Sequence, residues 1–452
     1  MSNPPPIEEL TIARLHAAYL SGDVTSATIT RAYLDRIEAY DRRGPYLNSL
    51  ISLNAVALHE ADRLDAALRA GGTLTGPLHG VPVIVKDNLD TVDMPTTSGL
   101  RILKDFVPER DAFIVRRLRN AGAILLAKAS LSELAMGLPD NINSVLPGFT
   151  RNPYNLAYAS GGSSGGTGVA IAANFGTIGL GTDTGGSVRA PASINNLVGV
   201  RPTVGLVSRT GMAPLDSRRD TPGPMTRSVE DAADPCVMGL FESAVADLLA
   251  AGADLVDDFR VPGFEHFPRP PQTAATTRAD WERFFAYQGP AFPIKSVADL
   301  RDAPPGKRVH PLHAARIAEI AAVTLAPEED PETIEGRKTE QAYRDAFTAA
   351  MDLARVDALV LPVWTYPPVL LGDRGQSPQG GMTFIASALQ WPVVAVPIGF
   401  VGEHLPIGMQ FLARPWAEGP LLRLAYAYEQ HSPHRRPPLT TPPLAGPHRL
   451  QM

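Results

Sequence analysis

Two clusters of serine and glycine form the part of the sequence best suited to chemistry. The stretch 160–187 holds ten glycines among its 28 residues, against 39 in the whole chain of 452, and its only charged residue is Asp183. One cluster contains Ser163 and Ser164, and the other ends at Ser187. Glycine allows positive φ, so that backbone N–H groups can converge on one point. Serine hydroxyls beside such N–H groups offer what acyl transfer needs, a nucleophile and donors for the oxyanion.

Other catalytic patterns fit this chain less well. Ser164 is the centre of a G-x-S-x-G pattern, but residues 155–160 are a poor strand and the later histidines lie in loops or in the tail, which disfavours an α/β-hydrolase. No G-K-[ST] follows the glycines, which disfavours a phosphate site. No H-x-x-x-H or H-E-x-x-H spacing suggests a metal site. Cys236 has no glycine nest or basic neighbour. We therefore expect serine chemistry without histidine, and neither metal nor cofactor.

A lysine is the remaining candidate for the base. Lys86 directly follows the β-branched run Val81–Val85, at the carboxyl end of a predicted buried strand, where open α/β sheets bind ligands. Burial there would lower its pKa and make it neutral near working pH. The plainer interpretation, a strand-end lysine that reaches solvent, is the commoner one in proteins.

Composition indicates an ordinary globular protein. Hydrophobic residues make up 44% and charged residues 19%, and a net charge of −6 gives no basic patch for nucleic acid or anionic membranes. The single cysteine excludes a disulfide framework. The amino-terminal residues lack the apolar run of a secretion signal, and no run is apolar enough to span a membrane. We expect a cytoplasmic protein.

Short apolar strands alternate with helices along the chain, which predicts an α/β fold. We expect one large domain over 1–452, with a core at 10–430 and a mixed, mostly parallel twisted sheet covered by helices on both faces. Predicted strands are 81–85, 123–127, 198–202, 205–208, 253–259, 358–362 and 393–397. Predicted helices are two within 7–40, then 55–69, 112–120, 241–251, 340–354 and 421–430.

Two proline-rich regions depart from this alternation. Residues 260–330 are predicted to be an irregular excursion, with helices near 279–287 and 312–324, that forms a lid or a substrate wall. Aromatic residues in it and in a later loop favour an aryl or hydrophobic substrate group: Trp281, Phe284, Phe285, Trp364, Tyr366 and Phe384. The tail 432–452 is expected to be frayed.

These motifs together resemble the amidase signature family of serine hydrolases. The resemblance rests on GGSSGG and GLGTDTGGSVRAPA, with VPVIVKDN upstream and GVRPTVGLVS and LQWPVVAVPIG downstream. It extends from about residue 10 to residue 429 and is densest over 80–229. After Ala233 the chain looks some tens of residues shorter than family members, which we expect to open one side of the site.

The resemblance implies a role for each site residue. Ser187 is expected to be the nucleophile, Ser163 the bridging serine after a cis peptide bond, and Lys86 the terminal base. Backbone N–H groups of the nucleophile loop are expected to form the oxyanion hole: Thr184, Gly185, Gly186 and Ser187. Supporting residues are Ser164, Asp183 and Arg189, and substrate contacts are expected from Met136 and Gly137.

The family contains two functional classes that fit this sequence. The first is a free-standing hydrolase, monomeric or homodimeric, that cleaves small carboxamides and also accepts esters or carbamates, as a urethanase does. The second is a glutamine-amidotransferase-type subunit that releases ammonia for a tRNA-dependent partner. The charge balance and the segment 190–196 favour the first class.

Overall fold

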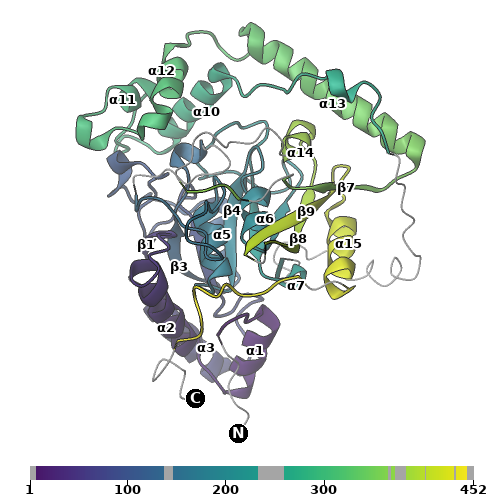
Figure 1. Cartoon of the computed structure of the whole chain (residues 1–452). Coiled ribbons are helices and arrows are strands. Elements are labelled where there is room, and N and C mark those ends of the chain that lie inside the picture. Colours follow the sequence, from purple (N-terminus) through teal and green to yellow (C-terminus); the bar gives the residue numbers. More distant parts are fainter. Residues whose placement is uncertain are drawn as a thin grey trace.

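One sheet of nine strands connects the parts of the chain that the structure describes. The structure is a computed structural model and describes residues 7–136, 146–232, 259–364, 368–371, 383–402, 404–431 and 434–444. The strand order is β1-β3-β2-β4-β6-β5-β8-β9-β7 (Figure 1). The strands are β1 (Leu50–Leu53), β2 (Pro82–Lys86), β3 (Ile124–Ala129), β4 (Ile178–Asp183), β5 (Val198–Arg201), β6 (Thr221–Thr226), β7 (Ala358–Pro362), β8 (Val393–Val401) and β9 (Leu405–Ala413).

The pairing of the strands is mixed, as predicted, but the expectation that parallel pairs predominate is wrong. Only β2 makes parallel pairs, with β3 and β4, and the remaining neighbouring strands run antiparallel. The carboxyl half of the chain returns through short connections, as between β8 and β9, and such connections produce antiparallel neighbours. The parallel part is the centre, where Val85 pairs with Leu180 and brings Lys86 beside the end of β4.

Helices cover both faces of the sheet, as predicted. On β5, Val198 and Val200 pack in the cluster of α15, whereas a Cβ on Gly199 would lie 2.6 Å from Ala192 of α6 on the other face. The alternation follows from the two-residue period of a strand. The helices are α1 (Ile12–Ser21), α2 (Ser26–Ile37), α3 (Ala57–Gly71), α4 (Phe113–Asn120), α5 (Gly165–Ala172), α6 (Arg189–Ile194), α7 (Val229–Ala232), α10 (Ala274–Tyr287), α11 (Val297–Arg301), α12 (Ala314–Ala322), α13 (Pro331–Ala354), α14 (Thr383–Leu389) and α15 (Glu418–His431).

The strand predictions succeed for the β-branched runs and fail elsewhere. Four strands are missing from the prediction: β1, β4, β6 and β9. Two of them, β4 (IGLGTD) and β6 (TPGPMT), were missed because they contain the glycines and prolines that usually mark turns. The predicted strand 205–208 is wrong, since these residues form a turn after β5. The helix predicted at 241–251 and nearly all of the strand at 253–259 lie outside the described residues.

The two helices predicted within 260–330 are confirmed as α10 and α12, but the region is a packed helical layer rather than an irregular excursion. Helices α10, α11 and α12 lie together at one end of the molecule, next to the long α13 (Figure 1). They share an apolar cluster that includes Trp281, Phe285 and Phe292. This packing gives the helices their own core despite the prolines between them. The expectation that these aromatic residues favour an aryl substrate is therefore wrong for Trp281 and Phe285, which are almost fully buried in that core.

The carboxyl-terminal tail is held where the structure describes it, over 434–444. Arg435 Nη2 donates to Glu9 Oε1 at 2.7 Å, and Arg36 Nη1 donates to the carbonyl of Pro442 at 2.9 Å. Arg36 is fully buried in α2. The predicted fraying is wrong for this segment, because Glu9 binds the Arg435 side chain and Arg36 binds the backbone at Pro442.

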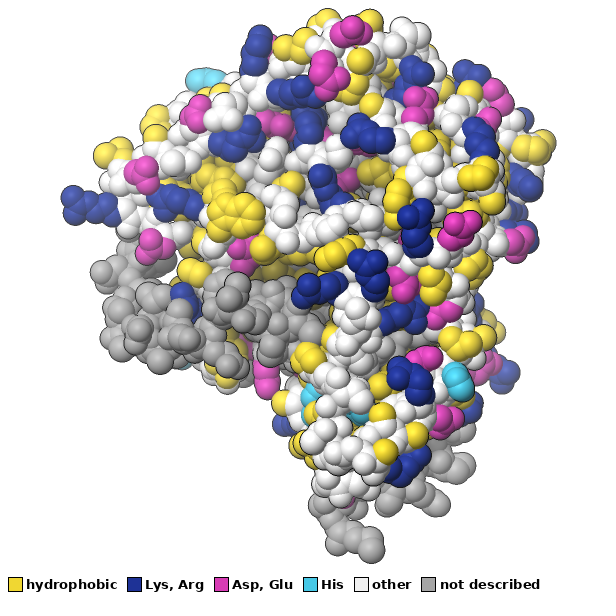
Figure 2. Space-filling view, turned by 180° about the vertical axis from the view of Figure 1, so that it is seen from behind, with side chains coloured by type: hydrophobic (Ala, Val, Ile, Leu, Met, Phe, Trp, Pro, Cys, Tyr) yellow, Lys and Arg dark blue, Asp and Glu magenta, His cyan; other side chains and the backbone are white. Residues whose placement is uncertain are grey.

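The surface agrees with the weak net charge. On the face shown in Figure 2, Lys and Arg side chains are interspersed with Asp and Glu rather than gathered in one patch. No helix in the described ranges combines the length and the apolar composition that a membrane span requires.

Candidate active site

Lys86 lies at the centre of a buried polar cluster at the end of β2. Its side chain is fully buried, and its Nζ atom lies 2.8 Å from Ser163 Oγ and 2.8 Å from Thr182 Oγ1. The carbonyl of Thr182 is a third partner at 3.4 Å. Burial lowers the pKa of Lys86 to about 7, although Asp183 and Asp220 act to raise it. Burial therefore favours the neutral amine, and the solvent-reaching alternative is excluded because the side chain is fully buried.

Ser163 and Ser164 form the turn that leads into α5. The Gly162–Ser163 peptide bond is cis, as the resemblance implied. Ser164 Oγ donates to the carbonyl of Thr182 at 3.1 Å and accepts from the Thr182 N–H at 3.2 Å. Ser164 therefore fixes the end of β4 against α5 and does not contact Lys86. A Cβ at Gly166 would lie 2.3 Å from the Ser130 carbonyl, so glycine is required for this close approach.

Ser187 stands on the loop between β4 and α6. Its carbonyl accepts from the Ser164 N–H at 3.2 Å, so the two serine-glycine clusters meet in space. Ser187 is half-buried and lines a cavity, and the neighbouring Gly185 is exposed. Gly186 adopts φ +124°, a conformation that side chains disfavour. The loop thus presents Ser187 and its backbone N–H groups to a space that a substrate can reach.

The Asp183 carboxylate holds this loop in shape. It accepts from the N–H groups of Gly186 and Val188 and pairs with Arg189 at 3.1 Å and Arg201 at 2.7 Å. All three charged side chains are fully buried. Burial acts to raise the pKa of Asp183, but the two guanidinium groups lower it well below its ordinary value. Asp183 and Arg189 therefore support the loop, as predicted, and Arg201 joins them.

Asp183→Asn is expected to lower the free energy of unfolding by about 3–5 kcal/mol, because two buried guanidinium groups lose their counter-charge. Arg201→Met leaves one carboxylate paired with one guanidinium and should lower the free energy of unfolding by less. Urea unfolding of both variants checks this order, and an equal loss in both would contradict it.

The four predicted oxyanion donors are not equivalent. The Gly186 N–H already donates to Asp183 Oδ1 at 3.0 Å. The N–H groups of Thr184, Gly185 and Ser187 have no acceptor among the described residues, and all three residues line the cavity. They remain the candidate donors for a developing oxyanion.

Asp220 supports the same loop through Thr184. Its fully enclosed carboxylate accepts from the Thr184 hydroxyl and from the N–H groups of Leu215, at 2.9 Å, and Asp216, at 3.1 Å. Burial raises the pKa of Asp220 to about 7. Asp220 thus connects the nucleophile loop to the cavity wall at Leu215.

Activity that depends on neutral Lys86 should rise with pH near 7, which gives the pH–activity profile a rising limb. Asp220→Asn is expected to move this limb to lower pH, by an amount limited by the Asp220 pKa of about 7, because the ionised fraction of Asp220 raises the pKa of Lys86. The asparagine amide can still hydrogen-bond Thr184, so the maximal rate should change less than about tenfold. Thr184→Val removes the same hydrogen bond without a charge change and should leave the limb in place. A limb that stays in place in Asp220→Asn contradicts the prediction.

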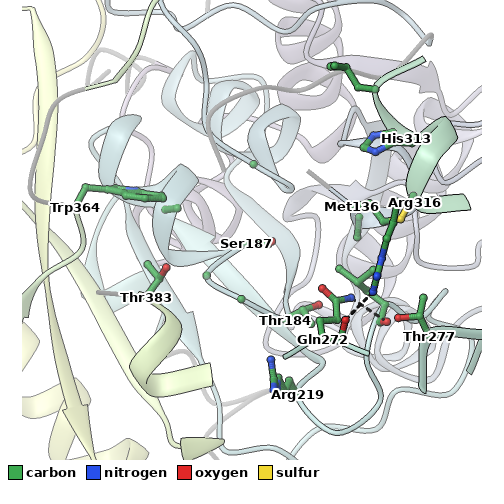
Figure 3. A pocket seen from close by; sticks show the side chains of 17 residues that line it. Met136, Thr184, Ser187, Arg219, Gln272, Thr277, His313, Arg316, Trp364 and Thr383 are labelled. Atoms are coloured by element: carbon green, nitrogen blue, oxygen red, sulfur yellow. Dashed lines mark hydrogen bonds between the residues drawn. The ribbon is translucent and has the colours of Figure 1, made fainter. Parts of the chain in front are cut away.

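The cavity has a volume of about 370 Å³, and its lining comes from several parts of the chain (Figure 3). The nucleophile loop provides one side, and Gln272, Thr277, Leu312, His313 and Arg316 provide a wall from the helical layer. The region predicted to be a substrate wall therefore lines the cavity. Met136 lines it as well, in the place expected for a substrate contact, and Gly137 lies outside the described residues.

Among the described aromatic residues that were expected near a substrate, one lines the cavity. That residue is Trp364. Phe284 packs against the cluster of the helical layer, and Phe384 lies under the Arg269 guanidinium. Tyr366 is outside the described ranges. The lining is a mixture of apolar, hydroxyl and guanidinium groups rather than an aromatic box.

Four further residues around the site were not predicted from the sequence. Thr182 and Asp220 lie in or near the glycine-rich motifs, but their partners are 96 and 36 positions away. Asn88 donates to Thr182 Oγ1 at 3.1 Å. Arg201 lies in the GVRPTVGLVS motif, and its place in a motif of the family resemblance is the signal that could identify it from sequence. No cluster of three or more potential metal ligands occurs in the described parts of the chain.

Comparison with known proteins identifies the family. The Amidase family model matches residues 28–236 and 233–422. A Glutamyl-tRNA(Gln) amidotransferase subunit of Symbiobacterium thermophilum is 32% identical over 491 aligned positions, covering 95% of this chain and 99% of that protein. The same-named protein of Moorella thermoacetica is 35% identical, covering 92% and 95%.

Solved structures show the same fold. The native peptide amidase from Stenotrophomonas maltophilia superimposes with a TM-score of 0.82 at 33% identity, covering 97% of this chain and 100% of that one. The Glutamyl-tRNA(Gln) amidotransferase subunit from Thermotoga maritima gives 0.67 at 26% identity, covering 97% and 99%.

The two segments of the family match meet at residues 233–236, where the sequence predicts a shortening, and the 491 aligned positions exceed the 452 residues of this chain. An opening of the site at that point stays a prediction, since 233–258 are not described. The family model, the relatives and the fold agree: this chain is a hydrolase of the Amidase family.

Proposed function

We propose that the chain hydrolyses a carboxamide through an acyl-enzyme on Ser187. The observation that supports this most directly is the buried Lys86 amine, 2.8 Å from Ser163 Oγ and with a pKa of about 7. An amine in that state can accept a proton from a hydroxyl at neutral pH. The adjoining loop presents a second serine and several N–H groups to a cavity. These are the parts that amide hydrolysis by a serine requires.

The contacts of Lys86 suit it to act as a base toward Ser163. A neutral amine has two N–H groups and one lone pair. Thr182 offers two acceptors, its hydroxyl oxygen and its carbonyl oxygen, which can take both N–H groups. The lone pair is then left for the Ser163 hydroxyl. Asn88 also donates to Thr182 Oγ1, which holds that oxygen in place.

The proposed reaction begins with two proton transfers. Lys86 takes the proton of Ser163, and Ser163 takes the proton of Ser187, whose oxygen attacks the substrate carbonyl carbon. The N–H groups of Thr184, Gly185 and Ser187 stabilise the oxyanion. As the C–N bond breaks, the protons return through Ser163 to the leaving amine. Water then hydrolyses the acyl-enzyme with the same base. Esters and carbamates present a carbonyl to the same serine and are expected to react.

Two functional classes within the family remain to be separated. The free-standing hydrolase is supported by the TM-score of 0.82 with a peptide amidase, against 0.67 with a protein of the amidotransferase class. The amidotransferase class is supported by the curated relatives, which are 31–35% identical over nearly their full length and carry that name. The curated relatives therefore favour the amidotransferase class, whereas the charge balance and the segment 190–196 favour the free-standing hydrolase. Both classes use the same proposed chemistry.

The deciding experiment measures the release of ammonia or amine from glutamine, an aliphatic amide, an anilide and an aryl carbamate, and the release of alcohol from an ester. The wild-type chain and Ser187→Ala are compared, with size-exclusion chromatography in parallel. A free-standing hydrolase should elute as a monomer or a homodimer and should hydrolyse amides other than glutamine without any partner protein. Turnover of glutamine only, stimulated by a co-purified partner, would establish the amidotransferase class. Activity that persists in Ser187→Ala would refute the proposed nucleophile.

A further inference from the structure

The cavity beside Ser187 contains two guanidinium groups and no carboxylate among its described lining residues. The two are Arg219, from the loop before β6, and Arg316, from α12. Figure 3 shows both side chains at the cavity, together with Ser187 and Thr184. The imidazole of His313 is also in the lining, and burial lowers its pKa to about 4, so it is uncharged at neutral pH. The fixed charges of the described lining are therefore both positive.

Arg219 is a buried and positioned group rather than a surface arginine. It is 9% exposed, and its Nε donates to Glu340 Oε1 at 2.8 Å. Its Nη2 donates to the same oxygen and to the carbonyls of Pro270, at 3.2 Å, and Pro271, at 3.0 Å. None of these partners is among the lining residues of the cavity, and together they hold the plane of the guanidinium in one orientation.

The third nitrogen of Arg219 is available to a ligand. Nη1 has no hydrogen-bond acceptor among the described residues, although a guanidinium has five N–H groups to satisfy. A donor that is fixed, partly desolvated and unmatched at a cavity wall favours an acceptor from the substrate, and a carboxylate most of all. Arg316 differs, because its Nη1 pairs with Glu319 at 2.6 Å and its Nη2 donates to the Gln272 carbonyl at 2.6 Å.

We propose that Arg219, with Arg316 as a second positive charge, binds a carboxylate on the substrate, so that the preferred substrates are small amides that carry a carboxylate. This rests on the proposed amide hydrolysis at Ser187. The cavity of about 370 Å³ accommodates a short acyl chain with such a group. The inference replaces the aryl substrate that the sequence suggested, since Trp364 is the only one of those aromatic residues that lines the cavity within the described ranges.

The test compares three amides of similar size: glutaramate, with a carboxylate, 5-oxohexanamide, with a neutral ketone, and 5-aminopentanamide, with an ammonium group. Wild-type kcat/KM should be about 10–100-fold higher for glutaramate than for the ketone, and lowest for the ammonium compound. Arg219→Gln should remove most of this preference, because kcat/KM for glutaramate should fall by about 10-fold or more beyond any change in kcat/KM for the ketone. Arg219→Lys keeps the charge but lacks the planar guanidinium, so its preference for glutaramate should be intermediate between those of the wild type and Arg219→Gln.

Arg218→Gln is the matched control. Arg218 also pairs with Glu340, at 3.5 Å, but it is not part of the cavity lining, so this variant should keep the preference for glutaramate. Thermal unfolding of each variant shows whether it is folded. Equal kcat/KM for glutaramate and the ketone in the wild type, or a preference that survives in Arg219→Gln, would overturn the proposal while leaving the hydrolase function intact.

Calorimetric titration with glutarate makes the test independent of catalysis. Glutarate should bind the wild type and Ser187→Ala alike and bind Arg219→Gln at least about tenfold more weakly. If no amide is hydrolysed but glutarate binding depends on Arg219, the proposed function fails and the carboxylate site stands. Absence of Arg219-dependent binding overturns the site.

Discussion

Ser187→Ala is expected to abolish amide hydrolysis, with a loss in kcat on the order of 10⁴- to 10⁶-fold, because the acyl-enzyme cannot form without the attacking oxygen. The side chain makes no hydrogen bond that supports the fold among the described residues, and the contact to Ser164 comes from its carbonyl. The free energy of unfolding should therefore change little. The measurement is ammonia release under substrate saturation.

Intact mass after brief exposure to a p-nitrophenyl ester provides a second readout. The wild type should gain the mass of one acyl group, and Ser187→Ala should gain none. Ser208→Ala, a serine outside the cavity lining, is the control and should behave like the wild type. Acylation of Ser187→Ala would place the nucleophile elsewhere.

Lys86→Met should lower kcat by about 10²- to 10⁴-fold and remove the rising limb of the pH–activity profile. In the wild type, burial lowers the pKa of Lys86 to about 7, and the active form is the neutral one. Activity should therefore rise as pH increases through 7 and then level off, whereas below 7 it should fall about tenfold per pH unit as the amine is protonated. Rates of acylation over pH 5–9 measure this limb.

Lys128→Met separates this effect from simple burial of a lysine. Lys128 is equally buried on the next strand, but it pairs with Asp87 at 3.1 Å. Its removal leaves a buried carboxylate unpaired and should reduce stability without moving the pH limb. A limb near pH 7 that persists in Lys86→Met, or that disappears in Lys128→Met, would assign the base to another group.

The sequence was most informative about the site where several short motifs coincide. Lys86 follows a β-branched run, and Ser163 and Ser187 lie in glycine-rich segments, so local pattern marked these segments. The role of each of the three residues was implied by the family resemblance. The structure brings Lys86 to Ser163 across 77 positions, because β2 pairs with β4 and Ser164 binds Thr182 at the end of β4. The roles of these residues stay predictions, and β4 itself was not predicted as a strand.

The residues that define the cavity wall could not be predicted in the same way. Arg219 and Arg316 reach the cavity because a helical layer packs over the sheet, and nothing in their local sequence distinguishes them from surface arginines. Trp281 and Phe285 show the reverse error, because they were expected to contact the substrate but are buried in the core of that layer. Such outcomes depend on packing between distant segments, which periodicity and motif spacing do not encode.

The bound tail has a consequence for how the protein is made. Glu9 and Arg36 lie more than 400 positions before Arg435 and Pro442, the residues that bind them. Synthesis proceeds from the amino terminus at about 5–20 residues per second, so these contacts can form no sooner than about 20 seconds after Arg36 is added to the chain. A chain truncated before residue 434 lacks both partners and should leave Arg36 Nη1 without its Pro442 acceptor.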